Sequence, residues 1–279
     1  MIVSTAWLAE RLGQVHLRVV DASFYLPNSG RDPASEYVAG HIPGAIFFDL
    51  EASSEQATPL PHMLPTAEAF AERMSALGLS DDDEIVVYDG SGKNLSAPRV
   101  WWMFRVFGHE RVSVLDGGFG KWQREGRPIE RGVMPPRPRG TFAAQLDRSM
   151  VRDLAQVRQN IERRAEQVVD MRSAGRFAAL EPEPRPGLRG GHMPGSLNLP
   201  FDTLVQADGT VLPEAELRQR IEAAGVELSR PVMATCGSGV SACALVFSLY
   251  LLGHHEAAVY DGAWSEWGAR EDTPIVTGR

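Results

Sequence analysis

The feature that most constrains the fold of this 279-residue chain is an internal repeat. Four short motifs of the first half return in the second half, in the same order and at offsets that drift only between 145 and 151 residues. The pairs are "VVD" at 19–21 and 168–170, "GHIPGA" at 40–45 and "GHMPGS" at 191–196, "VVYDG" at 86–90 and "MATCG" at 233–237, and "LDGGFGKW" at 115–122 and "YDGAWSEW" at 260–267. Because chance rarely gives four ordered matches at nearly one offset, the chain is predicted to hold two copies of one domain.

Within each copy, helices are predicted to alternate with buried strands. Apolar side chains at Phe70, Met74 and Leu77 repeat with helical spacing, and a short apolar run at 84–89 follows them. The second copy repeats this order, and the next predicted elements are helices at about 97–107 and 240–252 and strands at 112–115 and 257–260. Helices between parallel strands make βαβ units, so the predicted fold class is α/β: two tandem domains, each a small parallel sheet flanked by helices.

The domain limits follow from the composition between the copies. The segment "RGVMPPRPRG" at 131–140 is rich in Pro, Gly and Arg, which is typical of a linker rather than of a helix or strand interior. The predicted organisation is a first domain over 1–132, a linker over 133–147 and a second domain over 148–279.

Composition and charge exclude several classes of protein. No apolar run approaches the ~18 residues that a membrane-spanning helix needs. The formal net charge of -8 argues against a general nucleic-acid surface, because such binding requires a basic face. The amino terminus carries no basic cluster ahead of an apolar core, so neither a signal peptide nor a transit peptide is predicted, and the expected location is the cytoplasm.

The two cysteines of the chain lie in one short stretch, "ATCGSGVSAC". Cys236 follows a predicted strand, and ligands of open α/β sheets bind at this edge of the sheet. The small residues after it allow a tight turn whose amides converge on one point, and the following helix adds the positive end of its dipole. Such surroundings favour a thiolate over a thiol. Cys236 is therefore predicted to be a nucleophile in an exposed loop, and Cys243 is predicted to be a core residue.

Other cysteine chemistry fits the sequence less well. Cys236 and Cys243 would lie about 10 Å apart along one helix, too far for a disulfide, and two cysteines alone do not make a zinc site. In the first copy Asp89 stands at the position of Cys236, so only the second domain can use a cysteine. A cysteine phosphatase would need an arginine to close the loop, whereas residues 241–243 are Ser, Ala and Cys. A non-catalytic sulfur carrier or interaction scaffold is the remaining alternative.

With these motifs the chain resembles the tandem-domain rhodanese-like sulfurtransferases. The resemblance covers nearly the whole chain, from "DASFYLPNSGRD" at 21–32 to "YDGAWSEW" at 260–267, and "CGSGV" is its sharpest motif. In that family the active-site loop holds the catalytic cysteine and binds the sulfur donor. Here that loop comprises Cys236, Gly237, Ser238, Gly239, Val240 and Ser241.

The loop residues also bear on the donor that the resemblance implies. Relatives that use thiosulfate carry basic side chains at the second and third loop positions, which here are the neutral Gly237 and Ser238. The resemblance thus implies sulfur transfer from 3-mercaptopyruvate, through a persulfide on Cys236, to a thiol or cyanide acceptor, with release of pyruvate. Thiosulfate as the donor is the alternative.

The resemblance also implies site residues outside the loop. The substrate arginines of the family correspond to Arg176 in "GRF" and Arg185 in "PEPR", and guanidinium groups suit carboxylate and keto oxygens. A proton relay of serine, histidine and acid would fall on Ser238, His62 and Glu51, so the site would lie between the two halves of the chain. Relatives have Asp where this chain has Glu51. The resemblance implies a dithiol such as thioredoxin as the acceptor, and it calls for no metal or organic cofactor.

Overall fold

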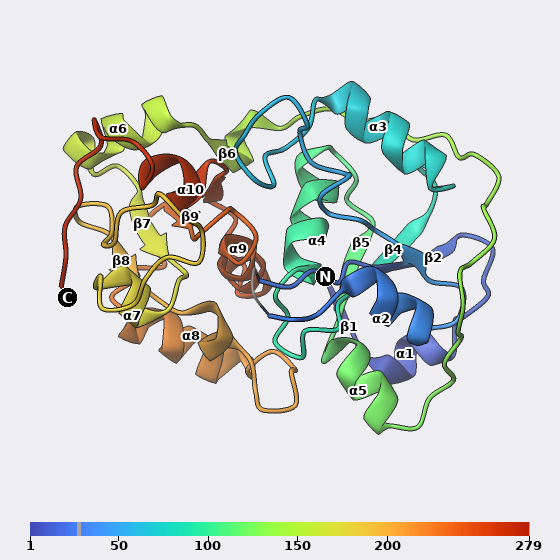
Figure 1. The fold of residues 1–279 in the computed structure, drawn as a ribbon. Coiled ribbons are helices and arrows are strands. Elements are labelled where there is room, and N and C mark those ends of the chain that lie inside the picture. Colours follow the sequence, from blue (N-terminus) through green and yellow to red (C-terminus); the bar gives the residue numbers. More distant parts are fainter. Residues whose placement is uncertain (27–28, 279) are drawn as a thin grey trace. The chain divides into compact units, whose positions relative to one another are not determined.

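A computed structural model describes residues 1–26 and 29–278, which form two compact units (Figure 1). Unit 1 comprises Met1–Gln56, Leu64–Asp147 and Val205–Val211. Unit 2 comprises Ala57–Met63, Arg148–Leu204 and the chain from Leu212 onward. Each half of the sequence therefore gives one short segment to the unit built mainly by the other half, which no sequence pattern had indicated.

Unit 1 alternates strands and helices along the chain. Its elements are β1 (Ile2–Val3), α1 (Thr5–Ala9), β2 (Leu17–Asp21), α2 (Pro33–Ala39), β3 (Ile46–Phe47), α3 (Ala67–Ala76), β4 (Glu84–Tyr88), α4 (Ala97–Val106), β5 (Val112–Leu115) and α5 (Gly118–Arg124). Local sequence sets these limits: at α3, for example, the Thr66 side chain accepts a hydrogen bond from the Ala69 amide and caps the helix.

Unit 2 follows the same plan. Its elements are η1 (Arg148–Met150), β6 (Val151–Arg152), α6 (Leu154–Arg163), β7 (Gln167–Asp170), α7 (Ala174–Phe177), β8 (Leu197–Asn198), η2 (Phe201–Leu204), α8 (Glu214–Ala223), β9 (Val232–Thr235), α9 (Ala242–Leu251), β10 (Ala257–Tyr260) and α10 (Ala263–Trp267). A capping box between Asp153 and Gln156 begins α6. Among the described residues, no helix combines the length and the apolar character needed to cross a bilayer.

The sheets confirm the prediction of two parallel α/β domains. Within the described residues, each unit has one five-stranded sheet, with strand orders β1-β5-β4-β2-β3 and β6-β10-β9-β7-β8. All of these strand pairs are parallel, and corresponding strands occupy corresponding positions. Gly108 and Gly253 adopt left-handed backbone conformations just after α4 and α9, a position where glycine commonly ends a helix.

Helices cover both faces of each sheet (Figure 1). In unit 1, Val19 and Val86 pack with side chains of α1, α2 and α5. Alternate strand residues point to the other face, where α4 packs against β4 and β5. In unit 2, Val168 and Met233 pack with α6 and α10, while α9 packs against β9 and β10. All of Ala242–Leu249 is buried, which fits a helix that is apolar all round.

Candidate active site

The loop after β9 is held in place by α10. The predicted strand ends at Thr235, Cys236 follows, and α9 begins at Ala242, two residues later than predicted. The amide of Trp264 donates to the Cys236 carbonyl at 2.9 Å, and both the amide and the Oγ of Ser265 donate to the Gly237 carbonyl at 2.9 and 2.7 Å. We call residues 236–241 the cysteine loop.

The prediction that Cys236 lies in an exposed loop is wrong. Its side chain is only 2 % exposed, because the hydrogen bonds to α10 hold the loop against the body of unit 2. Gly239 turns the chain with a φ of +77°, a conformation that favours glycine. Cys243 is a core residue as predicted, fully buried with its Sγ 3.4 Å from the Gly239 carbonyl oxygen. Neither cysteine forms a disulfide.

Ser238 and His62 come together although they are 176 positions apart. The segment Ala57–Met63, which contains His62, belongs to unit 2. His62 Nδ1 lies 2.9 Å from Ser238 Oγ of the same unit. His62 is 1 % exposed and has a φ of +60°. A side chain in this left-handed region costs about 1–3 kcal/mol of backbone strain, and such strain concentrates at functional sites. Two members of the predicted relay are thus in hydrogen-bond contact, while Glu51 belongs to unit 1 and its role stays a prediction.

A set of ion pairs that the sequence did not reveal leads from the sheet to the cysteine loop. Arg172 lies just beyond the end of β7, fully buried, and its Nη2 is 2.6 Å from Asp170 Oδ2. Its Nη1 is 2.6 Å from Glu183 Oε1. The other carboxylate oxygen of Glu183 accepts from Arg176 Nη2, also at 2.6 Å. We call Asp170, Arg172, Glu183 and Arg176 the buried charge chain.

The buried charge chain balances two cations with two anions. Burial opposes the charge of the Arg172 guanidinium, but Asp170 and Glu183 outweigh it and raise the pKa of Arg172 above its ordinary value. The guanidinium also donates to the Gly191 carbonyl at 2.7 Å and lies 4.1 Å from the ring centre of Trp264. Charges buried this deeply persist only when paired and hydrogen-bonded, as these are.

Arg176 brings the buried charge chain to the cysteine loop. It lies in the single turn of α7, which Ser173 caps, and its side chain is 16 % exposed. A Cβ placed on Gly237 would come within 2.9 Å of Arg176 Nη2, so the guanidinium lies directly against the backbone of the residue after Cys236. Arg185, the second predicted substrate arginine, is half-buried in the same unit, and its role stays a prediction.

Unit 1 shows which kind of group such a loop binds. Asp89 follows β4 as Cys236 follows β9, and it is 2 % exposed. Its Oδ2 accepts hydrogen bonds from the amides of Ser96 and Ala97, each at 2.9 Å, where α4 begins. Its Oδ1 accepts from the Ser91 amide at 2.8 Å. The strand-to-helix loop of this fold thus surrounds an anion with amides, although the loop of unit 2 is two residues shorter.

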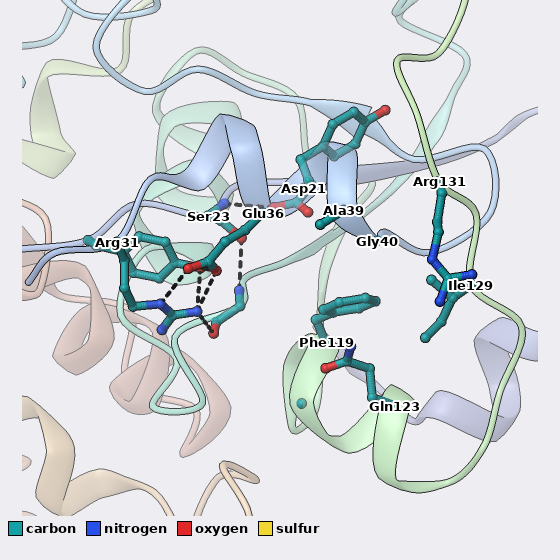
Figure 2. Close-up of a pocket in the computed structure, with 14 residues that line it drawn as sticks. Asp21, Ser23, Arg31, Glu36, Ala39, Gly40, Phe119, Gln123, Ile129 and Arg131 are labelled. Atoms are coloured by element: carbon teal, nitrogen blue, oxygen red, sulfur yellow. Dashed lines mark hydrogen bonds and ion pairs between the residues drawn. The ribbon is translucent and has the colours of Figure 1, made fainter.

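The same edge of unit 1 also contains a cavity of about 270 Å³, shown in Figure 2. Its polar wall is an arginine clamp: Arg31 pairs with Glu36 at 2.5 Å and donates to the Gly90 carbonyl at 3.1 Å. The Arg31 guanidinium stacks on the Tyr25 ring, 3.7 Å from its centre. Asp89 stands where unit 2 has Cys236, and both cysteines of the chain lie in unit 2.

The chain is similar to known sulfurtransferases along most of its length. The model of the rhodanese-like domain matches residues 4–125 and 153–270. The 3-mercaptopyruvate sulfurtransferase of Rattus norvegicus is 46% identical over 96% of this chain and 92% of its own. The Arabidopsis thaliana protein named thiosulfate/3-mercaptopyruvate sulfurtransferase 1, mitochondrial, is 44% identical over 98% of this chain and 77% of its own. The crystal structure of SseA from Escherichia coli, presented as a 3-mercaptopyruvate sulfotransferase, matches with a TM-score of 0.86 and 41% identity, covering 95% of this chain and 99% of that one.

Proposed function

Because this chain belongs to the family of proteins with rhodanese-like domains, we propose that it transfers sulfur from 3-mercaptopyruvate through a persulfide on Cys236. Similar proteins are named for 3-mercaptopyruvate alone and for thiosulfate together with it, so sequence identity does not choose the donor. The position of Arg176 against Gly237 carries the choice. The Arg176 guanidinium presents a planar pair of donors that matches the carboxylate of a keto acid, a group that thiosulfate lacks, and the loop itself carries no cation for the dianion.

The first half-reaction forms the persulfide. The Cys236 thiolate attacks the sulfur of 3-mercaptopyruvate; the S–S bond forms as the C–S bond breaks, and its electron pair moves to C3 of the departing pyruvate enolate. Arg176 and Arg185 hold the carboxylate and keto oxygens, so they stabilise the charge that grows on the enolate. The substrate's thiol proton passes to C3 and leaves pyruvate, with the terminal sulfur anionic on Cys236.

The contact between His62 and Ser238 supplies a route for this proton. Their Nδ1 and Oγ atoms, 2.9 Å apart, can each donate or accept, and Ser238 is two residues from Cys236. In the second half-reaction an acceptor thiolate or cyanide attacks the terminal sulfur, and the Cys236 thiolate leaves. We propose a dithiol protein such as thioredoxin as the acceptor and the cytoplasm as the location, although the similar Arabidopsis protein is named mitochondrial.

A comparison of donors tests the proposal. The purified protein is given 3-mercaptopyruvate or thiosulfate with cyanide as the acceptor, and kcat/KM is measured for each. We expect a preference of about 100-fold for 3-mercaptopyruvate, because a mismatched charge costs several kcal/mol and each ~1.4 kcal/mol is about tenfold. Without acceptor, the peptide containing Cys236 should gain the mass of one sulfur atom. A higher kcat/KM with thiosulfate would show that the donor assignment is wrong.

Replacing the histidine tests the proton route. His62→Gln keeps a polar side chain but cannot shuttle a proton, so kcat with 3-mercaptopyruvate should fall by about 100-fold, the lower range of general acid–base effects. Discharge of a preloaded persulfide by cyanide needs no such transfer and should keep its rate. The matched control is His254→Gln, because His254 lies in the same unit and binds only backbone carbonyls. Equal kcat values for the two variants would remove His62 from the mechanism.

A further inference from the structure

Glu183 joins two guanidinium groups that have different surroundings. Its side chain is 1 % exposed, and one carboxylate oxygen accepts from Arg172 Nη1 while the other accepts from Arg176 Nη2, each at 2.6 Å. The first oxygen also accepts from Arg176 Nε at 3.3 Å. Arg172 is fully buried and anchored by Asp170, so Glu183 ties a partly exposed arginine to a fixed internal charge.

This arrangement leaves one side of Arg176 available to a ligand. Nε and Nη2 face Glu183, and Nη2 also lies against Gly237. In the part of the chain that the structure describes, the hydrogen bonds of the Arg176 side chain involve Nε and Nη2 and none involves Nη1. A free arginine side chain has many rotamers, so fixing it in one of them costs conformational entropy. Because Glu183 already holds the guanidinium, binding a ligand there costs less of that entropy.

We propose that Glu183 is a positioning residue that fixes Arg176 beside the cysteine loop so that its guanidinium receives the carboxylate of a 2-keto acid donor. This inference rests on the proposed function. Glu183 touches no reacting atom; it acts through Arg176. The length of its side chain matters, because the carboxylate must reach Arg172 and Arg176 at the same time.

Glu183→Asp tests this positioning without changing the charge. Shortened by one methylene, the carboxylate can stay with Arg172 but cannot hold Arg176 in the same place. KM for 3-mercaptopyruvate should rise about 10-fold and kcat should fall by less than KM rises, because the contact with the donor carboxylate is the same in substrate and transition state, whereas only a contact with the keto oxygen strengthens as the enolate forms. The matched control is Glu181→Asp: this exposed glutamate, two residues earlier, bonds to Ser173 rather than to an arginine, and its KM should not change.

A second readout does not depend on the donor. Iodoacetate and iodoacetamide are general cysteine reagents, and only the first is an anion, so the ratio of their rates of reaction with Cys236 reports a cation placed beside the sulfur. We expect this ratio to fall at least about threefold in Glu183→Asp and to stay at the wild-type value in Glu181→Asp. Failure of wild type to use 3-mercaptopyruvate would contradict the proposed function alone, since the alkylation ratio still reports the placement of Arg176.

Two outcomes would overturn the role of Glu183. The first is a Glu183→Asp variant whose alkylation ratio and KM equal those of Glu181→Asp. If its midpoint of unfolding were lower at the same time, Glu183 would contribute to stability but not to the position of Arg176. The second outcome is a raised alkylation ratio in Glu183→Gln, the variant to use if Glu183→Asp does not fold. Removing an anion by itself makes the site more positive and raises the ratio, whereas loss of the Arg176 position lowers it. A lower ratio and a higher KM are expected, and a raised ratio would contradict the proposal.

Discussion

Cys236→Ser should abolish sulfur transfer from every donor. A serine hydroxyl is not ionised near neutral pH and cannot carry a second sulfur, so kcat/KM should fall by at least about 10⁴-fold, as it does when a covalent nucleophile is removed. The measurement is pyruvate release from 3-mercaptopyruvate, together with the mass of the peptide that contains residue 236. No sulfur should be added to that peptide.

The second cysteine provides the control for this substitution. Cys243 is fully buried, is the second residue of α9, and its Sγ faces the Gly239 carbonyl oxygen. Cys243→Ala should keep kcat within about threefold, because it removes only one small buried group. Turnover that survives in Cys236→Ser, or that disappears only in Cys243→Ala, would refute the proposed nucleophile.

The α/β fold could be predicted from the sequence because the same pattern of motifs, helices and strands occurs in both halves of the chain. The "VVD" motif ends both β2 and β7, and corresponding motifs cover the ends of β4 and β9, so each copy supported the interpretation of the other. The strands predicted at 112–115 and 257–260 have the predicted limits. Segment exchange between the units could not be predicted. Ala57–Met63 is short and proline-rich, without helical or strand periodicity, so nothing local shows which core it joins.

For the site, local chemistry could be predicted but long-range pairing could not. The loop that contains Cys236 was visible from its glycines and its place after a strand. Glu183 and Arg172, in contrast, lie in irregular segments where charged residues are usually solvated. Only the fold shows that both are buried and that they connect Asp170 to Arg176. The repeated "VVD" motif contained part of the signal, since Asp170 ends its second copy.

The two copies differ in the residue that faces the aspartate at the end of the "VVD" motif. Asp21 in unit 1 corresponds to Asp170 in unit 2, but Ser23 stands where unit 2 has Arg172. Burial raises the pKa of Asp21, and nearby Asp89 adds to this, although hydrogen bonds from Ser23 and Tyr88 oppose it. Unit 2 has an arginine at this position, and Glu183 pairs with this cation and with Arg176.

Arg172→Leu should therefore strongly destabilise unit 2. The substitution leaves the carboxylates of Asp170 and Glu183 buried without their shared cation, and breaking a buried ion pair on one side costs about 3–5 kcal/mol. Urea unfolding followed by tryptophan fluorescence measures this loss, because Trp264 packs against the Arg172 guanidinium. The m-value should stay unchanged, since the surface exposed on unfolding is nearly the same.

Arg270→Leu is the control for this prediction, because Arg270 also forms a two-bond ion pair in unit 2 but is exposed to solvent. Arg270 forms two hydrogen bonds with Asp272, at 2.8 and 2.9 Å, and its side chain is 43% exposed. Arg270→Leu should cost less than about 1 kcal/mol, because exposed ion pairs are weak. If Arg172→Leu cost as little, the buried charge chain could not be the rigid anchor from which Glu183 positions Arg176. The stability of the leucine variant thus bears directly on how the substrate arginine is held.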